Sequence, residues 1–229
     1  MRAAGNLCRA TRFTRHQNNH EEETALSTSG TIEFFFDFLS PFAYLTQQKL
    51  PAMAQRYGYA LRFVPIDLPR AKLAAGNTGP SNRQVPAKLR YLTADMNRWA
   101  QRYGVPLRFP KTFASERMNK GTLFAQDRGR AQDYVTAAFS SAWARGGEDL
   151  DDPALLAKLS RELGWPEAEF LAFLDSSQAA ERYEALNLEA HARGVFGVPT
   201  MLIGEEMWWG NDRLQFFEEF LQQHSLKAA

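Results

Sequence analysis

The residue best placed for chemistry is a serine at the start of a predicted helix. Ser40-Pro41 follows an apolar run of strand length and precedes an apolar stripe with helical spacing. Serine is a favoured N-cap, and proline is favoured at the first helical position. Free backbone N–H groups and the helix dipole at such a junction favour a negative charge. The Ser40 hydroxyl cannot exchange disulfides, but it can donate a hydrogen bond to a thiolate that a ligand brings.

The chain supplies almost no thiol or metal-binding chemistry of its own. Its one cysteine, Cys8, lies near the N-terminus in no motif. A dithiol oxidoreductase needs two nearby cysteines, so that class is excluded. The histidines show no HExxH or comparable ligand spacing, and we expect no metal site. His191 is expected near the C-terminal end of a helix, where it suits the dipole.

Two further segments lie where strands meet other elements. Val198-Pro199-Thr200 comes directly before a predicted strand, and Trp209-Gly210-Asn211-Asp212 joins the last strand to the last helix. Each has a structural alternative: Pro199 can simply begin a strand, and Asp212 can simply cap the helix. Ser40 can likewise be only a cap. We expect its two roles to be compatible only in part, because one hydroxyl hydrogen cannot serve both.

The elements that hold these residues are readable from hydrophobic periodicity. Ile32–Phe38 predicts a strand buried on both faces, and the helix that follows should kink or break at Pro51 and end at Gly58. A second strand is expected over Ala60–Val64. This gives a β-α-β opening.

The middle of the chain contains helical patterns and no convincing strand. Strands return as a hairpin over 200–203 and 207–209, and Asp212 is expected to cap a last helix. The order β-α-β, helices, β-β-α is that of an α/β thioredoxin fold with an inserted helical domain. The predicted middle helices cover 89–103, 134–143, 153–163, a stretch from 166, and 177–193.

This order predicts the domain organisation. Residues 31–70 and 195–225 form a discontinuous thioredoxin-like domain, and residues 71–194 form the inserted helical domain. Residues 1–30 lack an apolar core of a secretory signal and are expected to be a disordered tail.

Four motifs in order resemble the 2-hydroxychromene-2-carboxylate isomerases, which are relatives of kappa-class glutathione transferases and DsbA-like oxidoreductases. Each motif alone is weak, whereas the set is specific, and the resemblance covers about Thr31 to Leu221. The motifs are residues 36–44 (FDFLSPFAY), 79–83 (GPSNR), 194–200 (GVFGVPT) and 209–214 (WGNDRL).

The resemblance implies glutathione as the cofactor. Ser40 would then be the catalytic residue that tunes the glutathione sulfur. Pro199 is expected to be cis, with the Val198 backbone pairing with the cysteinyl part of glutathione. The stretch Trp209, Gly210, Asn211 and Asp212 is expected to hold the γ-glutamyl end, where Asp212 suits the ammonium group.

The resemblance also implies a substrate site for a small aromatic carboxylate. Asn82 matches a position expected to touch substrate or glutathione. Lys72, Arg83 and Tyr91 are candidate partners for the substrate carboxylate and ring hydroxyl. Surface charges and a packed tyrosine are the structural alternatives for these three.

Composition limits the other function classes. The net charge is +1 and the mean hydropathy is −0.42, which favour neither nucleic acid nor membrane as a partner. We expect a cytoplasmic protein, and the relatives suggest a homodimer. Two alternatives to the isomerase stay open: a kappa-like glutathione transferase or peroxidase, and a non-catalytic thioredoxin-fold module that binds peptides or a partner.

Overall fold

An aromatic strand forms the centre of the sheet. In this computed structural model, which describes residues 30–226, β1 (Thr31–Phe36) pairs in parallel with β2 (Ala60–Pro65), and Phe34 lies opposite Phe63. Phe34 and Phe35 point to opposite faces of the sheet, and both are fully buried. The prediction of a strand buried on both faces is confirmed.

The first helix is broken where the sequence placed a proline. α2 (Pro41–Gln47) ends after two turns, and α3 (Leu50–Tyr57) begins with Pro51 in its first turn. Gly58 ends α3 in the left-handed conformation at φ 84°. The short α2 therefore carries Ser40 at its N-terminus as a separate element.

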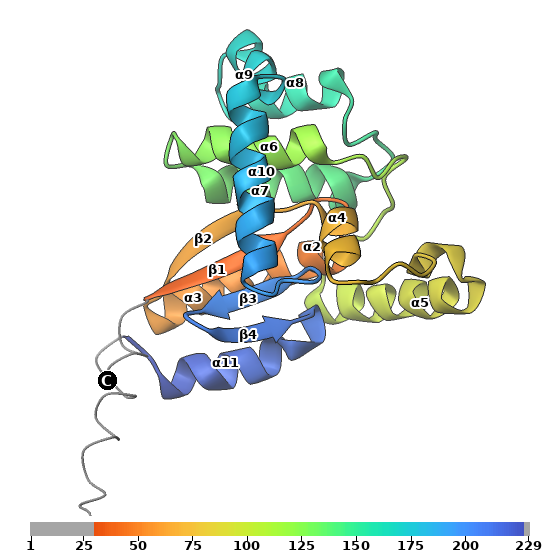
Figure 1. Cartoon of the computed structure of the whole chain (residues 1–229), viewed down its shortest axis with the longest axis vertical. Coiled ribbons are helices and arrows are strands. Elements are labelled where there is room, and N and C mark those ends of the chain that lie inside the picture. The colour runs from red at the N-terminus through yellow and green to blue at the C-terminus, as the bar shows by residue number, and fades with distance from the viewer. Residues whose placement is uncertain (1–29, 227–229) are drawn as a thin grey trace, which may run out of the picture.

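The C-terminal hairpin completes a four-stranded sheet in the order β2-β1-β3-β4. β3 (Thr200–Ile203) runs antiparallel to both β1 and β4 (Glu206–Trp209), with Phe34 opposite Met201. The α/β arrangement predicted from the sequence is confirmed, with helices between the two halves of the sheet (Figure 1). Cys8 and the predicted tail, apart from Gly30, lie outside the described residues.

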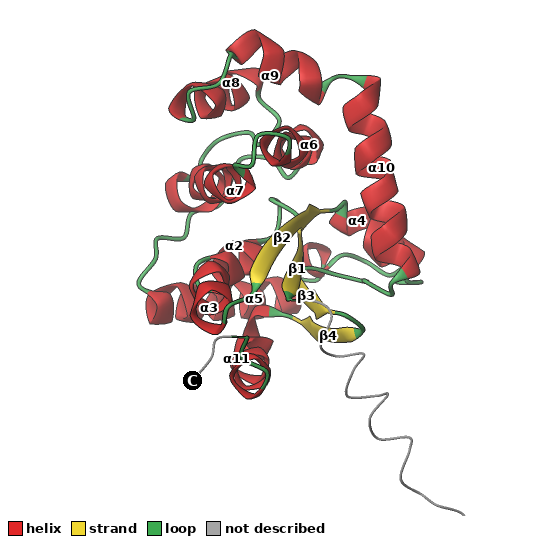
Figure 2. Cartoon of the chain, turned by 90° about the vertical axis from the view of Figure 1, so that its left-hand side faces the viewer, coloured by secondary structure: helices red, strands yellow, loops and turns green. Residues whose placement is uncertain are grey.

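Two helical layers cover the sheet, as Figure 2 shows. α2, α3 and α11 (Leu214–Gln223) cover the face with Phe34 and Phe36, which belong to the large core. α4 (Leu68–Ala74) and α10 (Ser177–Ala192) cover the face with Phe35, which belongs to a smaller cluster. The remaining helical segments are η1 (Asn82–Gln84), α5 (Pro86–Tyr103), α6 (Glu116–Gln126), α7 (Ala131–Phe139), the π-helix η2 (Ser140–Arg145), α8 (Pro153–Glu162) and α9 (Glu167–Leu174).

Helix α6 has no counterpart among the predicted helices. Every residue from Met118 to Ala125 is buried, including the polar Asn119 and Thr122. A helix buried all round carries no apolar stripe, so periodicity cannot reveal it. It lies at the centre of the helical region and contacts α7, α9 and α10.

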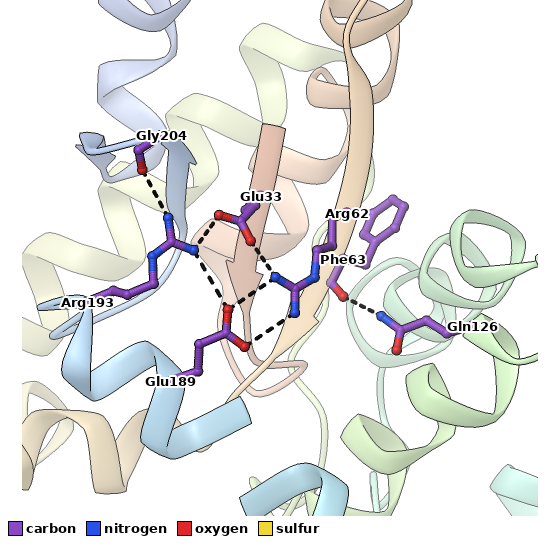
Figure 3. A network of polar contacts seen from close by, with 7 residues as sticks. All are labelled: Glu33, Arg62, Phe63, Gln126, Glu189, Arg193 and Gly204. Carbon is purple, nitrogen blue, oxygen red and sulfur yellow. Dashed lines mark hydrogen bonds and ion pairs between the residues drawn. The ribbon is translucent and has the colours of Figure 1, made fainter. Parts of the chain in front are cut away.

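Ion pairs fix α10 on the sheet. Arg62 on β2 pairs with Glu33 on β1 and with Glu189 on α10 at 3.1 Å (Figure 3). Arg193, just after α10, also pairs with Glu33 and donates to the Gly204 carbonyl at 3.0 Å. α10 is therefore joined both to the sheet and to the turn of the hairpin.

The start of α11 differs from the prediction. The 3-10 turn η3 (Asn211–Arg213) precedes α11, and no side chain caps the helix. Asp212 instead pairs with Arg213 at 3.3 Å. The prediction that Asp212 is an N-cap is wrong, because the 3-10 turn delays the start of α11 to Leu214 and leaves Arg213 at the cap position. No helix in the described part of the chain is long and apolar enough to cross a membrane.

Candidate functional site

Ser40 closes a tight turn between β1 and α2. Its backbone N–H donates to the Asp37 carbonyl at 2.9 Å, and its Oγ accepts the Ala43 N–H at 3.2 Å. The residue is buried, with 3% of its surface exposed. The predicted N-cap is therefore present, and Oγ lies at the helix N-terminus.

Capping leaves the hydroxyl hydrogen of Ser40 available. A capping oxygen is an acceptor, and a serine hydroxyl also has one O–H to donate. Within residues 30–226 no acceptor receives that hydrogen. The expectation that capping and thiolate donation compete is wrong, because they use different parts of the same group.

Val198, the residue before the cis proline, presents an unpaired backbone. The peptide bond between the two residues is cis, as expected. Neither the N–H nor the carbonyl of Val198 has a hydrogen-bond partner in the described part of the chain, since pairing with β1 starts only at Thr200. Such groups can pair with an extended peptide as an added strand would.

Trp209 packs on the loop before the cis proline. Its ring meets Phe196 edge to face, with 4.8 Å between centroids, and both side chains stay exposed. A Cβ on Gly197 would lie 2.8 Å from Trp209 Nε1. Only glycine at 197 lets the indole lie this close to the loop.

Gly210 sets the position of Asp212. The glycine has φ 109° and ψ 148°, and a Cβ there would lie 2.5 Å from Asp212 Oδ1. The Asp212 side chain is 55% exposed and has Arg213 as its partner. Its carboxylate is therefore held at the surface, where it can receive a ligand cation.

Asn211 is buried, whereas the neighbouring Asp212 is exposed. Its side chain is buried, and Oδ1 accepts hydrogen bonds from Thr46 and Tyr103, both at 3.3 Å. Its Nδ2 is buried and has no acceptor in the described residues. The side chain ties the end of β4 to α2 and α5.

The charges of Lys72 and Arg83 act on one another, and neither side chain has an acidic partner in the described residues. Burial lowers the pKa of Lys72, and the Arg83 charge lowers it further. Burial also lowers the pKa of Arg83, whose guanidinium lies 3.7 Å from the centre of the Phe113 ring. Two unneutralised cations whose charges interact favour an anionic ligand.

Tyr91 and Asn82 line one pocket of ≈ 450 Å³ at the outer end of α5, together with Lys88. Tyr91 is 63% exposed, so it is not the packed tyrosine of the structural alternative. A larger pocket of ≈ 580 Å³ lies along β2 and α3 and contains none of the predicted site residues.

One small core cluster connects most of these segments. Leu39, Ala71 and Val198, which are direct neighbours of Ser40, Lys72 and Pro199, are all buried in it. Phe113, which carries Arg83, packs against the same cluster. The fold thus brings the serine, the cis-proline segment and the two cations to one region beyond the C-terminal end of β1.

Comparisons with known proteins agree with this architecture. The model of the DSBA-like thioredoxin domain matches residues 31–222. A 2-hydroxychromene-2-carboxylate isomerase of Pseudomonas putida is 49% identical over 188 residues, which are 82% of this chain and 92% of that protein. The chain belongs to the 2-hydroxychromene-2-carboxylate isomerase family.

Two further similarities place this isomerase family among its relatives. A solved structure of a 2-hydroxychromene-2-carboxylate isomerase has a TM-score of 0.80 and 46% identity, covering 86% of this chain and all of that one. Glutathione S-transferase kappa 1 of Rattus norvegicus is 25% identical over 83% of this chain and 90% of its own length. The family resemblance inferred from the four motifs is confirmed.

Sequence reasoning missed three residues of this candidate site. Phe113 and Lys88 belong to no motif, although each neighbours a predicted residue in space. Asp37 lies inside the first motif, and its carboxylate is fully buried in the turn before Ser40. Its position between aromatic residues was the available signal, because an isolated acid in a buried strand end needs partners.

Proposed function

We propose that this protein is a glutathione-dependent isomerase that converts 2-hydroxychromene-2-carboxylate to trans-o-hydroxybenzylidenepyruvate in the catabolism of naphthalene-type aromatics. The observation that carries the proposal is the Ser40 hydroxyl. It lies at the N-terminus of α2 with a free hydrogen, in a chain close to half identical to isomerases of this name.

The residues of this site fit glutathione as a cofactor. The unpaired N–H and carbonyl of Val198 suit the backbone of an extended tripeptide. The exposed carboxylate of Asp212 suits the α-ammonium of the γ-glutamyl group. The Ser40 hydroxyl suits the sulfur, because the same helix N-terminus already favours an anion.

Bound glutathione supplies a thiol whose reversible addition to a conjugated double bond permits rotation about that bond. Ser40 has the task of keeping that sulfur ionised. A free thiol has a pKa of about 8.5 and is only a few per cent ionised at neutral pH. A hydrogen bond from the Ser40 hydroxyl to the charged sulfur lowers the pKa and raises the reactive fraction.

Lys72 and Arg83 have the task of holding the substrate carboxylate and the negative charge that develops on the substrate. Their mutual repulsion is relieved when an anion lies between them. Preorganised charges of this kind stabilise a developing anion more strongly than water does. Asn82 and Tyr91 line the adjoining pocket and are assigned to the substrate ring and its hydroxyl.

The test is a spectroscopic assay of the chromene with and without glutathione. The proposal predicts an absorbance change that depends on glutathione, with all glutathione recovered at equilibrium. A stable conjugate would instead identify a transferase, the activity named for the kappa relative. Absence of both the reaction and of glutathione binding in calorimetry would leave a non-catalytic binding module.

The proposal includes a cytoplasmic homodimer, as the resemblance implies. Light scattering on the purified chain measures the mass in solution directly. A mass of about 52 kDa, twice the 26.0 kDa of one chain, is expected. A monomeric mass would contradict this part alone.

A further inference from the structure

Both backbone polar groups of one residue in the active turn, Phe38, are held by side chains from the helical region. The Phe38 N–H donates to Asn119 Oδ1 at 3.2 Å, and the Phe38 carbonyl accepts Trp143 Nε1–H at 2.7 Å. Phe38 lies two residues before Ser40 and two residues after Phe36, the last residue of β1. The turn that carries the serine is thus clamped on both sides by residues 81 and 105 positions away.

Asp37 completes the same clamp. Its carboxylate accepts the Leu39 N–H at 3.1 Å and Asn119 Nδ2–H at 3.0 Å through one oxygen, which Ser115 Oγ also approaches at 2.6 Å. The other oxygen accepts the Leu68 N–H at the start of α4, at 2.9 Å. Asn119 therefore bonds the turn twice, once through the backbone and once through the acid.

Trp143 extends from the clamp toward the substrate side. It belongs to the π-helix η2, a rare geometry that is frequent at functional sites. Its buried indole packs on Phe113, with 6.4 Å between ring centroids. The Arg83 guanidinium lies over that Phe113 ring. One side chain thus contacts both the Ser40 turn and the support of a candidate substrate cation.

We propose that Asn119 and Trp143 are positioning residues for Ser40, because they hold the N–H and the carbonyl of Phe38 and through this backbone the direction of the hydroxyl. The role rests on the proposed function, in which that hydroxyl acts on a sulfur. Both residues lie too deep to touch substrate, since each is fully buried. A displacement of a catalytic group by about 1 Å can lower a rate about 100-fold.

The test replaces the hydroxyl by a reporter thiol. In a Cys8→Ser background, Ser40→Cys places a single thiol at the N-terminus of α2, and its pKa is read from the alkylation rate against pH. We expect a value below the ordinary 8.5 of a free thiol. Adding Trp143→Phe or Asn119→Ala should raise it by about half a unit to one unit, as the thiol moves out of line with the helix N-terminus.

Trp165→Phe is the matched control. Trp165 is also a buried tryptophan of the helical region, and it packs on Tyr134 and Phe170 rather than on the turn. It should lower the melting temperature without changing the pKa of the reporter thiol. Equal pKa values in Trp143→Phe, Asn119→Ala and the control would overturn the proposal. The two clamp variants test it separately, so one that fails to fold leaves the other decisive.

A kinetic measurement in the native Ser40 background gives a second readout. Each clamp variant should lower kcat by about 10- to 100-fold while KM for glutathione stays within about threefold. A parallel change in kcat for Trp165→Phe would contradict the assignment. If the wild type has no isomerase activity, the proposed function fails, and the reporter thiol still decides whether Asn119 and Trp143 position the turn.

Discussion

Replacing Gly210 by alanine tests how the turn after β4 presents Asp212. The residue has φ 109° and ψ 148°, a conformation that is almost restricted to glycine and costs other residues about 1–3 kcal/mol. A new Cβ would also lie 2.5 Å from Asp212 Oδ1, so the carboxylate must move. For a loss of about 2 kcal/mol, a domain of this size melts about 4–8 °C lower.

The same substitution should weaken glutathione binding. A charge-assisted hydrogen bond from the ligand ammonium to a half-exposed Asp212 carboxylate is worth about 1–2 kcal/mol, after a discount for solvent screening. The dissociation constant measured by calorimetry should therefore rise about 5- to 30-fold in Gly210→Ala. Asp212→Asn should weaken binding by a similar factor with little change in melting temperature.

Gly204→Ala is the control for backbone strain. Gly204 also has positive φ, at 58°, but a Cβ there meets no atom within 4 Å. It lies in the turn of the same hairpin, and alanine should cost about 1–2 kcal/mol of stability without affecting glutathione. The reasoning is refuted if Gly210→Ala keeps wild-type affinity, or if Gly204→Ala weakens binding equally.

Three other predictions concern charge, protonation and the cap. In steady-state kinetics, Lys72→Met should raise KM for the anionic substrate about 10-fold. It should not lower the stability of the protein, because it removes the like-charge repulsion with Arg83. Lys158→Met on α8 is the control and should change neither KM nor stability. Burial raises the pKa of the Asp37 carboxyl, so the native state binds more protons there than the unfolded state and loses stability as pH rises through the raised value. In denaturant unfolding, the stability of the wild type relative to Asp37→Asn should thus fall from pH 4 to 7, and a difference that is flat or rises would contradict this. Ser40→Ala and Ser176→Ala each remove a serine cap, at 3.2 and 3.1 Å, and each should cost about 1 kcal/mol, but only Ser40→Ala should abolish most glutathione-dependent turnover.

Local sequence patterns predicted where several of the helices begin and end. Ser40-Pro41 marked the start of α2 and Pro51 marked the break before α3, because each effect acts within a few residues of chain. The prediction that Asp212 caps α11 also relied on a local pattern, and it was wrong. The conformation of Gly210 turns the chain before the helix can begin, and a side-chain preference could not reveal that.

Hydrophobic periodicity could not predict contacts between segments that lie far apart in the sequence. Asn119 and Trp143 contact the Ser40 turn only because α6 and η2 fold back over the end of β1. Phe113 became part of the site through its stack with Arg83, from a loop without a motif. The sequence motifs pointed to the groups that are proposed to touch ligands, and they missed the residues that pack against these groups. The predicted domain boundaries at 70 and 195 stay predictions. Helix α10, from the predicted inserted domain, packs against β2 of the predicted thioredoxin-like domain.

The claim at the centre of this account is that Ser40 ionises a thiol that the protein itself lacks. The most direct measurement is the ultraviolet thiolate absorbance of glutathione bound to the protein, titrated against pH in the wild type and in Ser40→Ala. The account predicts a pKa well below 8.5 for the bound thiol in the wild type and a return toward 8.5 in Ser40→Ala. Bound glutathione that titrates at the same pH in both proteins would contradict it.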